Sequence, residues 1–429
     1  MRNKLLMKDH DFLNFSGMNF DITPKQNKFL SKIDRICKSL RSIEEYSYIQ
    51  ETSNDRLVKE FSKIGMLGCP ISRKYDGLGY DILTYLLALK RIGEEGSSMR
   101  TFFSAHTSIG QMVLQNWANE EQKNDFLKYT TQGQKIMAFG LTEPNAGSDP
   151  ASLTTTFEKK GNFYVLKGKK KWIGNGTFAN LMTTYAREKG SDGKISAFIV
   201  DVDSTSNIVR KEIKNKIGLL TVKNAEIEFK NCKIPCTNLL GLKDNGLNIA
   251  MSALIDGRLS VAAGAIGVME DCLKESTIYA RLRKQHGSSI AKKQLIQQHI
   301  SKIIVGIESS KWLVYKAANL RQKLHDYVEN LKINDKNWLQ KLVKGNMHYK
   351  NLRREVDRFA AIAKFYTTNA CFETANRSVQ IFGSSGYTKK SRVAKHFLDS
   401  RATTIYEGTN EILELKIASE FLGKRFRSF

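Results

Sequence analysis

Three short segments of the chain combine residue types that could hold a cofactor and move a proton. The first segment, residues 139–149, is shaped by proline and glycine and offers backbone N–H groups, carboxylates and the hydroxyls of Thr142 and Ser148. Such a loop can bind the polar edge of a planar ring and nearby phosphate oxygens. The second segment, residues 170–176, places Trp172 at the end of an expected strand, where it could pack against a ring or belong to the core.

The third segment, residues 405–411, has a glutamate between an aromatic residue and a glycine. Burial beside apolar groups would raise the pKa of Glu407 towards neutrality and suit it to remove a proton from a weakly acidic C–H bond. Alone, this segment could instead be a helix cap. No metal site is predicted, because Cys232 and Cys236 are followed by no second pair at zinc-ligand spacing.

The elements that must position these segments change type twice along the chain. Apolar residues recur at helical spacing from Asp21 to about Lys135, and again after Asn245 almost to the end. Between them, short apolar runs punctuated by Gly, Asn and Lys predict strands, with a hairpin turn at residues 159–162. The predicted strands include residues 163–166, 195–202 and 225–229. We therefore predict a mainly α protein with a central β domain, divided into residues 1–136, 137–243 and 244–429.

Bulk properties narrow the class of protein further. A net charge of +25 fits either a solvated lysine-rich surface or an anionic partner such as cofactor phosphates or an acidic carrier protein. Nucleic acid is not expected as a partner, because no DNA- or RNA-binding signature accompanies the charge. No apolar run approaches the ~18 residues of a membrane span, and the basic residues 1–10 lack a secretory apolar stretch, so we expect a cytoplasmic protein. A polar stretch near residues 322–358 is expected to extend or join two long helices, as a solvated hairpin or a docking surface.

Taken together, the motifs resemble the acyl-CoA dehydrogenase family from about residue 25 to residue 425. The first and third segments read Leu-Thr-Glu-Pro-x-x-Gly-Ser-Asp and Ile-Tyr-Glu-Gly-Thr, a combination that rarely arises by accident. Arg258, residues 283–287 and residues 380–383 add support. The resemblance implies an N-terminal helical domain, a middle β-barrel and a C-terminal four-helix bundle. It also implies FAD as cofactor.

The resemblance assigns expected roles to individual residues. Positions expected near the flavin and its pyrophosphate are Phe139, Leu141, Thr142, Ser148, Trp172, Gly174, Thr409 and Glu411. Positions that match contacts to the adenine end of a neighbouring subunit's FAD are Arg283, Gln294, Gln380 and Gly383. A homodimer or homotetramer is therefore expected.

The resemblance also implies the chemistry. Glu407 matches the base that removes the α-proton of an acyl thioester, while the β-hydrogen leaves as hydride to flavin N5. Some relatives carry the base just before Arg258, but Gly257 stands there and cannot serve. Residues expected to contact the substrate are Arg100, Ser148, Arg258, Tyr406 and Gly408. Hydrogen bonds from the ribityl hydroxyl and the Glu407 backbone N–H would stabilise the enolate-like charge.

Several departures from the family pattern bear on the reaction. Gly174 stands where many members have a threonine that hydrogen-bonds flavin N5, so an acyl-CoA oxidase using O2 remains an alternative to a dehydrogenase with an electron-transfer partner. His286 and Ser384 depart from the usual residues of the adenine contact.

Arg100 bears on the substrate. An arginine here is found in glutaryl-CoA dehydrogenases and in dehydrogenases of polyketide extender-unit pathways, and could bind a carboxylate. Alternatively it faces solvent or pairs with Glu94 or Glu95, and His106 is expected to be a packed histidine. The leading hypothesis is an FAD-dependent α,β-dehydrogenation of a short acyl thioester. A carrier-protein-bound hydroxyacyl or dicarboxylic substrate is the alternative, and the sequence does not choose between coenzyme A and a carrier protein.

Overall fold

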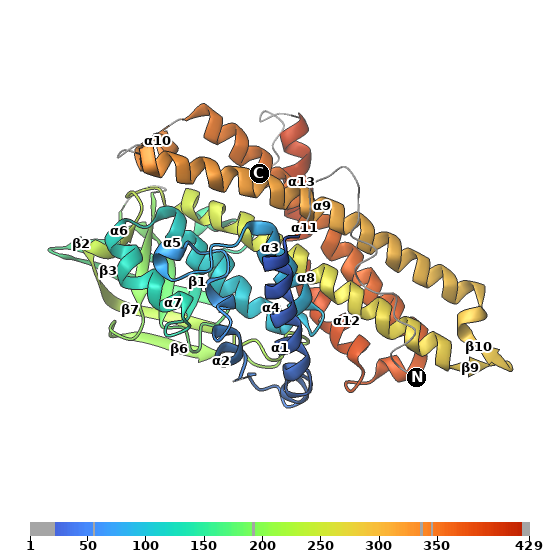
Figure 1. The fold of residues 1–429 in the computed structure, drawn as a ribbon. Helices are drawn as coiled ribbons and strands as arrows, with labels where there is room; N and C mark the ends of the chain where they lie inside the picture. Colours follow the sequence, from blue (N-terminus) through green and yellow to red (C-terminus); the bar gives the residue numbers. More distant parts are fainter. Residues whose placement is uncertain (1–21, 55, 191–193, 335–337, 345, 423–429) are drawn as a thin grey trace.

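A computed structural model describes residues 22–54, 56–190, 194–334, 338–344 and 346–422 (Figure 1). The basic residues 1–10 lie outside this range. The described chain runs through helices, then a sheet, then long helices, which confirms the predicted order of helical, β and helical regions.

The N-terminal region is a layer of helices that packs on the rest of the molecule. Its first helix begins where Pro24 occupies the first turn and Thr23 forms a capping box with Gln26. The main elements are α1 (Pro24–Ile49), α2 (Arg56–Ser62), α3 (Ile82–Gly93), α4 (Ser97–Phe103), a π-helical turn η3 (Ser104–Gln111), α5 (Met112–Trp117), α6 (Glu120–Gln122) and α7 (Lys128–Thr131).

The middle region is an eight-stranded sheet with its own apolar core. The strand order is β6-β7-β3-β2-β4-β5-β8, and β1 pairs with β4 in parallel. The predicted hairpin joins β2 and β3, with Lys160 opposite Phe163 across the turn. The strands are β1 (Met137–Gly140), β2 (Thr156–Lys160), β3 (Phe163–Ile173), β4 (Leu181–Glu188), β5 (Ile195–Asp201), β6 (Ile208–Glu212), β7 (Ala225–Pro235) and β8 (Leu239–Leu240).

The C-terminal region is built from long helices, which run obliquely across the molecule in Figure 1. A small hairpin of β9 (Lys284–Gln285) and β10 (Ser288–Ser289) separates the first two of them. The helices are α8 (Gly246–Leu282), α9 (Gln294–Asn334), α10 (Trp338–Lys344), α11 (Met347–Phe382), α12 (Arg392–Thr403) and α13 (Asn410–Leu422). The polar stretch 322–358 thus extends α9 and α11, as predicted, and contains α10.

Helix α8 is the central element of the molecule. Within the described residues it alone is long and apolar enough to cross a membrane, but 83% of its apolar window is buried inside the protein. It packs against α3 at glycines: a Cβ on Gly93 would lie 2.3 Å from the Gly264 oxygen, and one on Gly267 would lie 1.9 Å from the Lys90 oxygen. This close approach explains both the small residues of α8 and its apolar character as a core helix.

Candidate active site

The predicted base lies on a tight turn between α12 and α13. Glu407 has φ 57° and Gly408 has φ 89°, so the glutamate holds a left-handed conformation that costs about 1–3 kcal/mol for a residue with a side chain. The turn is closed by a hydrogen bond from the Asn410 N–H to the Thr404 oxygen at 3.0 Å. Thr409 caps α13 through its hydroxyl, which accepts from the Ile412 N–H at 3.3 Å. The helix-cap interpretation therefore holds for Thr409, while Glu407 is free for another role.

The Glu407 carboxylate lies against bare backbone on α8. A Cβ on Gly257 would come within 2.3 Å of Glu407 Oε2, so only glycine leaves room for this side chain. Within the described residues, Oε2 is buried and has no hydrogen-bond partner. Burial raises the pKa of Glu407 to about 7, against the opposing charges of Arg258, Arg100 and Lys364. Gly257, which has no side chain, thus leaves space for the Glu407 carboxylate.

Two buried cations hold the backbone of this turn. Arg258 on α8 donates from Nε to the Glu407 oxygen at 3.2 Å, and Lys364 on α11 donates from Nζ to the Gly408 oxygen at 2.8 Å. Arg258 is fixed in turn by Asp357, whose Oδ1 lies 2.6 Å from its Nη1. The polar stretch 322–358 therefore reaches the site through Asp357.

Arg100 points into the same region from α4. Its side chain is 1% exposed, and Nη2 donates to the Tyr406 hydroxyl at 2.5 Å. Its Nε and Nη1 are buried without a hydrogen-bond partner in the described residues. It packs along Gly264, where a Cβ would lie 2.7 Å from Nε. The solvent-facing alternative is wrong because the side chain is buried. A pair with Glu94 or Glu95 is also wrong, because Glu94 pairs with Arg91 and Glu95 pairs with Arg41, Arg91 and Arg392.

The residues expected near the flavin, 139–149 and 170–176, lie where β1 and β3 end. Phe139 and Leu141 are buried, and the Thr142 oxygen accepts from the Lys171 N–H at 2.9 Å, which ties the loop to β3. Trp172 is 53% exposed and has φ 62°, an unusual combination for a large aromatic residue. It is therefore no core tryptophan within this chain, and its ring is open to a ligand.

The end of β3 also contacts the helical layer that carries Arg100. A Cβ on Gly174 would lie 3.4 Å from the Ala105 Cβ, and Asn175 donates to the Phe102 oxygen at 3.2 Å. Ser148 and Glu411 are exposed. The structure thus brings Arg100, Arg258, Tyr406, Glu407 and Gly408 into direct contact, and it places the Trp172 loop beside α4.

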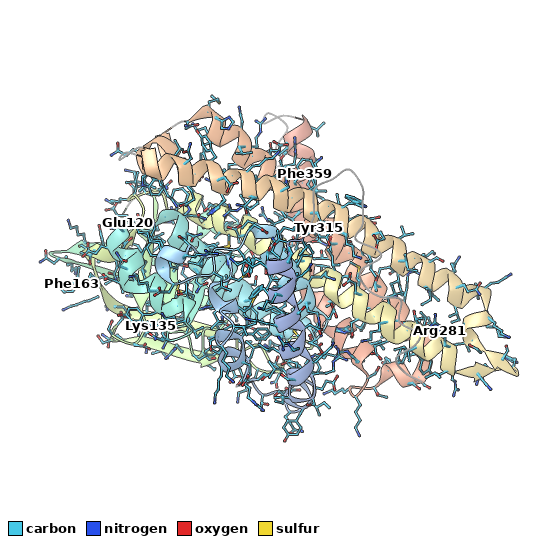
Figure 2. All side chains as sticks on the ribbon, in the orientation of Figure 1. Glu120, Lys135, Phe163, Arg281, Tyr315 and Phe359 are labelled. Carbon is cyan, nitrogen blue, oxygen red and sulfur yellow. The ribbon has the colours of Figure 1, made fainter. Side chains whose placement is uncertain are left out.

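The predicted adenine contacts lie elsewhere, at the far end of the long helices. Arg283, Gln294, Gln380 and Gly383 are all exposed, and Tyr279 stacks on Phe382 at 4.2 Å to join the ends of α8 and α11. Arg281, labelled in Figure 2, marks this end. Gly257 and Leu282 are 25 residues apart on α8, which corresponds to about 38 Å along the helix axis. These residues and Glu407 therefore belong to two separate places on one chain.

His106 is packed, as expected. Its Nδ1 accepts from the Met137 N–H at 3.0 Å, and Nε2 lies 3.1 Å from the Thr130 oxygen. Burial lowers the pKa of His106 to about 4, so it is neutral near physiological pH.

Sequence reasoning missed Lys364 and Asp357 as site residues. A usable signal existed for Lys364, which interrupts a stripe of small buried residues on α11: Ala360, Ala361, Ala363, Thr367 and Thr368. A charged residue at helical spacing within a buried stripe indicates a specific partner. Asp357 carried no such signal, because it stands in a strongly polar segment.

Comparison with known proteins shows the family of the chain. Residues 23–134, 138–232 and 244–422 match, in turn, the families described as acyl-CoA dehydrogenase N-terminal, middle and C-terminal domains. The chain is 35% identical over 373 residues to the short-chain specific acyl-CoA dehydrogenase of Clostridium acetobutylicum, covering 86% of this chain and 89% of that protein.

Two solved structures show the same fold. Butyryl-CoA dehydrogenase from Megasphaera elsdenii superposes with a TM-score of 0.85 at 30% identity, covering 95% of this chain and all of that one. The prolyl acyl carrier protein oxidase AnaB superposes with a TM-score of 0.83 at 29% identity, covering 94% of this chain and all of that one. Across all three regions, the chain belongs to the acyl-CoA dehydrogenase family of FAD-dependent oxidoreductases.

Proposed function

We propose that this enzyme removes the α-proton and β-hydride of a short acyl thioester, with Glu407 as the base. The observation that carries the proposal is the Glu407 carboxylate, which is held against Gly257. Its Oε2 has no partner among the described residues, and burial raises its pKa to about 7. A base with a pKa near the working pH is available as carboxylate and still basic enough to take a C–H proton. The similar Clostridium acetobutylicum protein is short-chain specific, which supports a short acyl group here.

The residues around the Trp172 loop fit an FAD ring. Trp172 offers an exposed aromatic face, and Gly174 leaves open space bounded by the Ala105 methyl group. When bound, FAD supplies the acceptor for the β-hydride. The loop residues Phe139, Leu141 and Thr142 would hold the ring and its phosphates.

The chain's own residues would orient the proton transfer. Arg258 and Lys364 donate to the carbonyls of the turn, and these hydrogen bonds oppose its rotation. In a trans peptide the N–H points opposite to the carbonyl, so the Gly408 and Thr409 N–H groups point away from the two cations. The Glu407 N–H belongs to the preceding peptide, and its role rests on the family resemblance. We assign the Glu407 N–H to the thioester oxygen, where it would stabilise the enolate-like charge.

Replacing Glu407 with Gln tests the base. We expect the rate of anaerobic flavin reduction by butyryl-CoA to fall by about 10²- to 10⁴-fold, because a general base is lost. Glu414→Gln, an exposed change on α13, serves as the control and should reduce flavin at the native rate. Native-rate reduction in Glu407→Gln would show that another group is the base.

A carrier-bound or carboxylated substrate is the second candidate, and Arg100 favours it. A buried guanidinium with two unpaired N–H directions is costly unless a ligand supplies acceptors. Arg100 touches Tyr406, the neighbour of the base, so an acceptor bound there would belong to the distal part of a short acyl group. The similar AnaB structure is a prolyl acyl carrier protein oxidase, and the net charge of +25 would suit an acidic carrier.

Flavin bleaching with matched thioesters separates these candidates. Four substrates would be used: butyryl and glutaryl groups, each attached to coenzyme A or to an acyl carrier protein. Each substrate would be given to the native enzyme and to Arg100→Met. A preference for glutaryl that disappears in Arg100→Met would assign Arg100 to the carboxylate. Equal bleaching by the glutaryl thioesters in both proteins would leave Arg100 outside substrate recognition.

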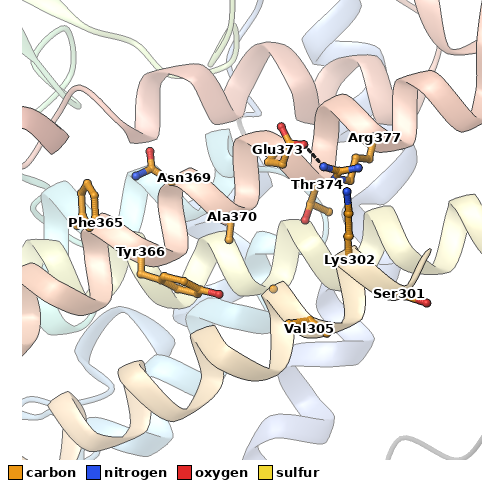
Figure 3. Close-up of a pocket in the computed structure, with 11 residues that line it drawn as sticks. Ser301, Lys302, Val305, Phe365, Tyr366, Asn369, Ala370, Glu373, Thr374 and Arg377 are labelled. Atoms are coloured by element: carbon orange, nitrogen blue, oxygen red, sulfur yellow. Dashed lines mark ion pairs between the residues drawn. The ribbon is translucent and has the colours of Figure 1, made fainter. Parts of the chain in front are cut away.

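We further propose that the active enzyme is at least a dimer. The four exposed adenine-contact residues lie too far from Glu407 for one extended dinucleotide to reach both places, so they would serve the FAD of a second subunit. A groove between α9 and α11 lies along the same helices and is lined by Lys302, Val305, Tyr366, Glu373 and Arg377 (Figure 3). Val305 is 63% exposed there, which suits a surface that another subunit covers.

Light scattering after size exclusion tests the assembly. We expect an oligomer for the native chain and a smaller species for Val305→Glu, because a charge would be buried at the contact. Val209→Glu, an exposed change on β6, is the control. A native monomer that retains FAD would contradict the proposal.

The reduced flavin would be reoxidised by an electron-transfer partner, or by O2 through the open space at Gly174. We expect the reduction of the flavin by substrate and its reoxidation to take place in the cytoplasm. Measuring reoxidation in air-saturated buffer distinguishes an oxidase from a dehydrogenase.

A further inference from the structure

Lys364 is a buried cation whose acceptors are uncharged. It lies on the inward face of α11 with no solvent exposure. Its Nζ donates to the Gly408 oxygen and to Asn410 Oδ1, each at 2.8 Å. A buried ammonium without a carboxylate in hydrogen-bond contact is costly, so its position calls for an explanation beyond packing.

The acceptors of Lys364 lie on the turn that carries the proposed base. Asn410 is held on its other side by Thr368 Oγ1 at 3.0 Å and by Asn369 Oδ1 at 2.8 Å, both on α11. One turn of α11 therefore fixes the residue that ends the 407–410 turn. The ammonium of Lys364 fixes the carbonyl in the middle of it.

The conformation of the turn needs such restraint. Glu407 and Gly408 both have positive φ, and a strained glutamate persists only where its surroundings over-determine it. Arg258 restrains the Glu407 carbonyl from α8, and Lys364 restrains the Gly408 carbonyl from α11. Rotation of either peptide would break a hydrogen bond to a charged donor, which is stronger than one to a neutral donor.

We propose that Lys364 is a positioning residue, whose ammonium holds the left-handed 407–408 turn and thereby aims the Glu407 carboxylate. The proposal rests on the proposed role of Glu407 as base. It goes further by assigning the orientation of that base to a lysine whose hydrogen bonds go to the turn itself.

The charge of Lys364 has a second consequence. Burial raises the pKa of Glu407, and Lys364 is one of three cations that oppose this rise. Burial likewise lowers the pKa of Lys364, to about 7, while Glu407 opposes that fall. The charged and titratable groups that face this pair are Arg100 on α4, Asp256 and Arg258 on α8, and Tyr406 and Glu411 beside the turn. Loss of the ammonium should therefore shift the titration of Glu407 upward.

Lys364→Met tests the proposal in the FAD-loaded enzyme, because methionine keeps the length of the side chain and removes its charge and donors. We expect flavin reduction by butyryl-CoA to slow by about 10- to 100-fold, since a small displacement of a reacting group has effects of this size. Amide hydrogen exchange of residues 405–410 should accelerate. The Glu407 carboxyl band, identified by infrared subtraction of Glu407→Gln, should titrate at higher pH than in the native protein.

Three further variants make the outcome specific. Lys350→Met, an exposed change on α11, should behave as native in all three measurements. Lys364→Gln keeps a neutral hydrogen-bond donor, so amide exchange in the turn should be slower than in Lys364→Met. The Glu407 titration should still shift upward, because the charge is lost. This variant replaces Lys364→Met in the test if the methionine variant does not fold. Thr368→Val removes a hydrogen bond to Asn410 while keeping the ammonium, so it should loosen the turn without shifting that titration.

Native exchange and native titration in a folded Lys364→Met would overturn the proposal. The proposal would also be overturned if the Glu407 titration shifted upward as far in Thr368→Val as in Lys364→Met. Such a result would mean that the shift comes from a loosened turn and not from the lost charge. Exchange and infrared titration do not require turnover. A failure of Glu407 as base would instead appear as unimpaired flavin reduction in Glu407→Gln.

Discussion

Two glutamates, Glu143 and Glu407, lie in the two long family motifs of the chain and have opposite surroundings. Glu143, in the loop of residues 139–149, accepts from the Thr154 N–H at 2.6 Å and the Thr155 N–H at 3.0 Å, and pairs with Lys170 at 2.7 Å. Although burial alone would raise its pKa, Lys170 and these donors lower the pKa of Glu143 to about 2. Glu407 has an unpartnered buried oxygen, and burial raises its pKa to about 7.

The difference shows how one residue type becomes structural or reactive. A carboxylate with every acceptor position used is locked in its charged form and braces the backbone. A carboxylate deprived of donors is held near neutrality and keeps the capacity to take a proton. The cations around Glu407 bind the backbone of its turn and leave its carboxylate unsatisfied, which preserves that capacity.

The largest effect we expect is on the free energy of unfolding when Glu143 is replaced. Glu143→Gln should lower the free energy of unfolding by about 3–5 kcal/mol, because it leaves Lys170 buried without its partner. Glu407→Gln should change stability far less at pH 5, where the native carboxyl is already protonated. Urea unfolding of both variants measures the contrast, and equal losses would erase the distinction.

A smaller effect is expected from filling the space beside the base. Gly257→Ala would place a methyl group where Glu407 Oε2 lies, so the carboxylate must move. We expect flavin reduction to slow by about 100-fold with flavin content retained. Gly147→Ala is the control for exchanging glycine for alanine, because a Cβ on Gly147 would have no atom within 4 Å. Only the stability of this control variant is measured. A native rate in Gly257→Ala would mean that the carboxylate acts from another position.

The two glutamates should also give opposite pH dependences. Glu143 has a folded pKa below its ordinary 4.5, so its stabilisation is present above 4.5 and lost as pH falls towards 2. Glu407 has a folded pKa above 4.5, so its contribution falls as pH rises from 4.5 through about 7. Glu407→Gln should therefore gain stability relative to native across that upper range. Flavin reduction should drop about tenfold per pH unit below 7, since only the carboxylate accepts a proton.

The smallest effect concerns a buried titratable group that takes no part in the reaction. His106→Leu removes the acceptor of the Met137 N–H and should cost about 1–3 kcal/mol in unfolding free energy. The pH profile of flavin reduction should keep its native midpoint, since His106 is neutral across that range. A displaced midpoint would bring His106 into the reaction.

Much of the fold could be predicted because its signals are local. The return of helical spacing after Asn245 agrees with the start of α8 at Gly246, and the Gly161 turn lies within the predicted hairpin. Glu407, Arg258 and Tyr406 were predicted through motifs and do meet in space. The contact of Arg100 with Tyr406 joins residues 306 apart in sequence, so no local pattern could reveal it.

The sequence by itself determined the order of helical and β regions, the family motifs and the candidate base, because periodicity, turn residues and short motifs are properties of neighbours along the chain. Only the tertiary structure decided that Arg100 is buried with unpaired donors, that Gly257 makes room for Glu407, and that Asp357 and Lys364 belong to the site. These facts depend on burial and on contacts between α4, α8, α11 and the 407–410 turn. The pKa of a lysine differs between a solvated surface and a buried site, and the partners of a lysine or arginine differ as well. Only the packing of the chain decides which environment the residue has.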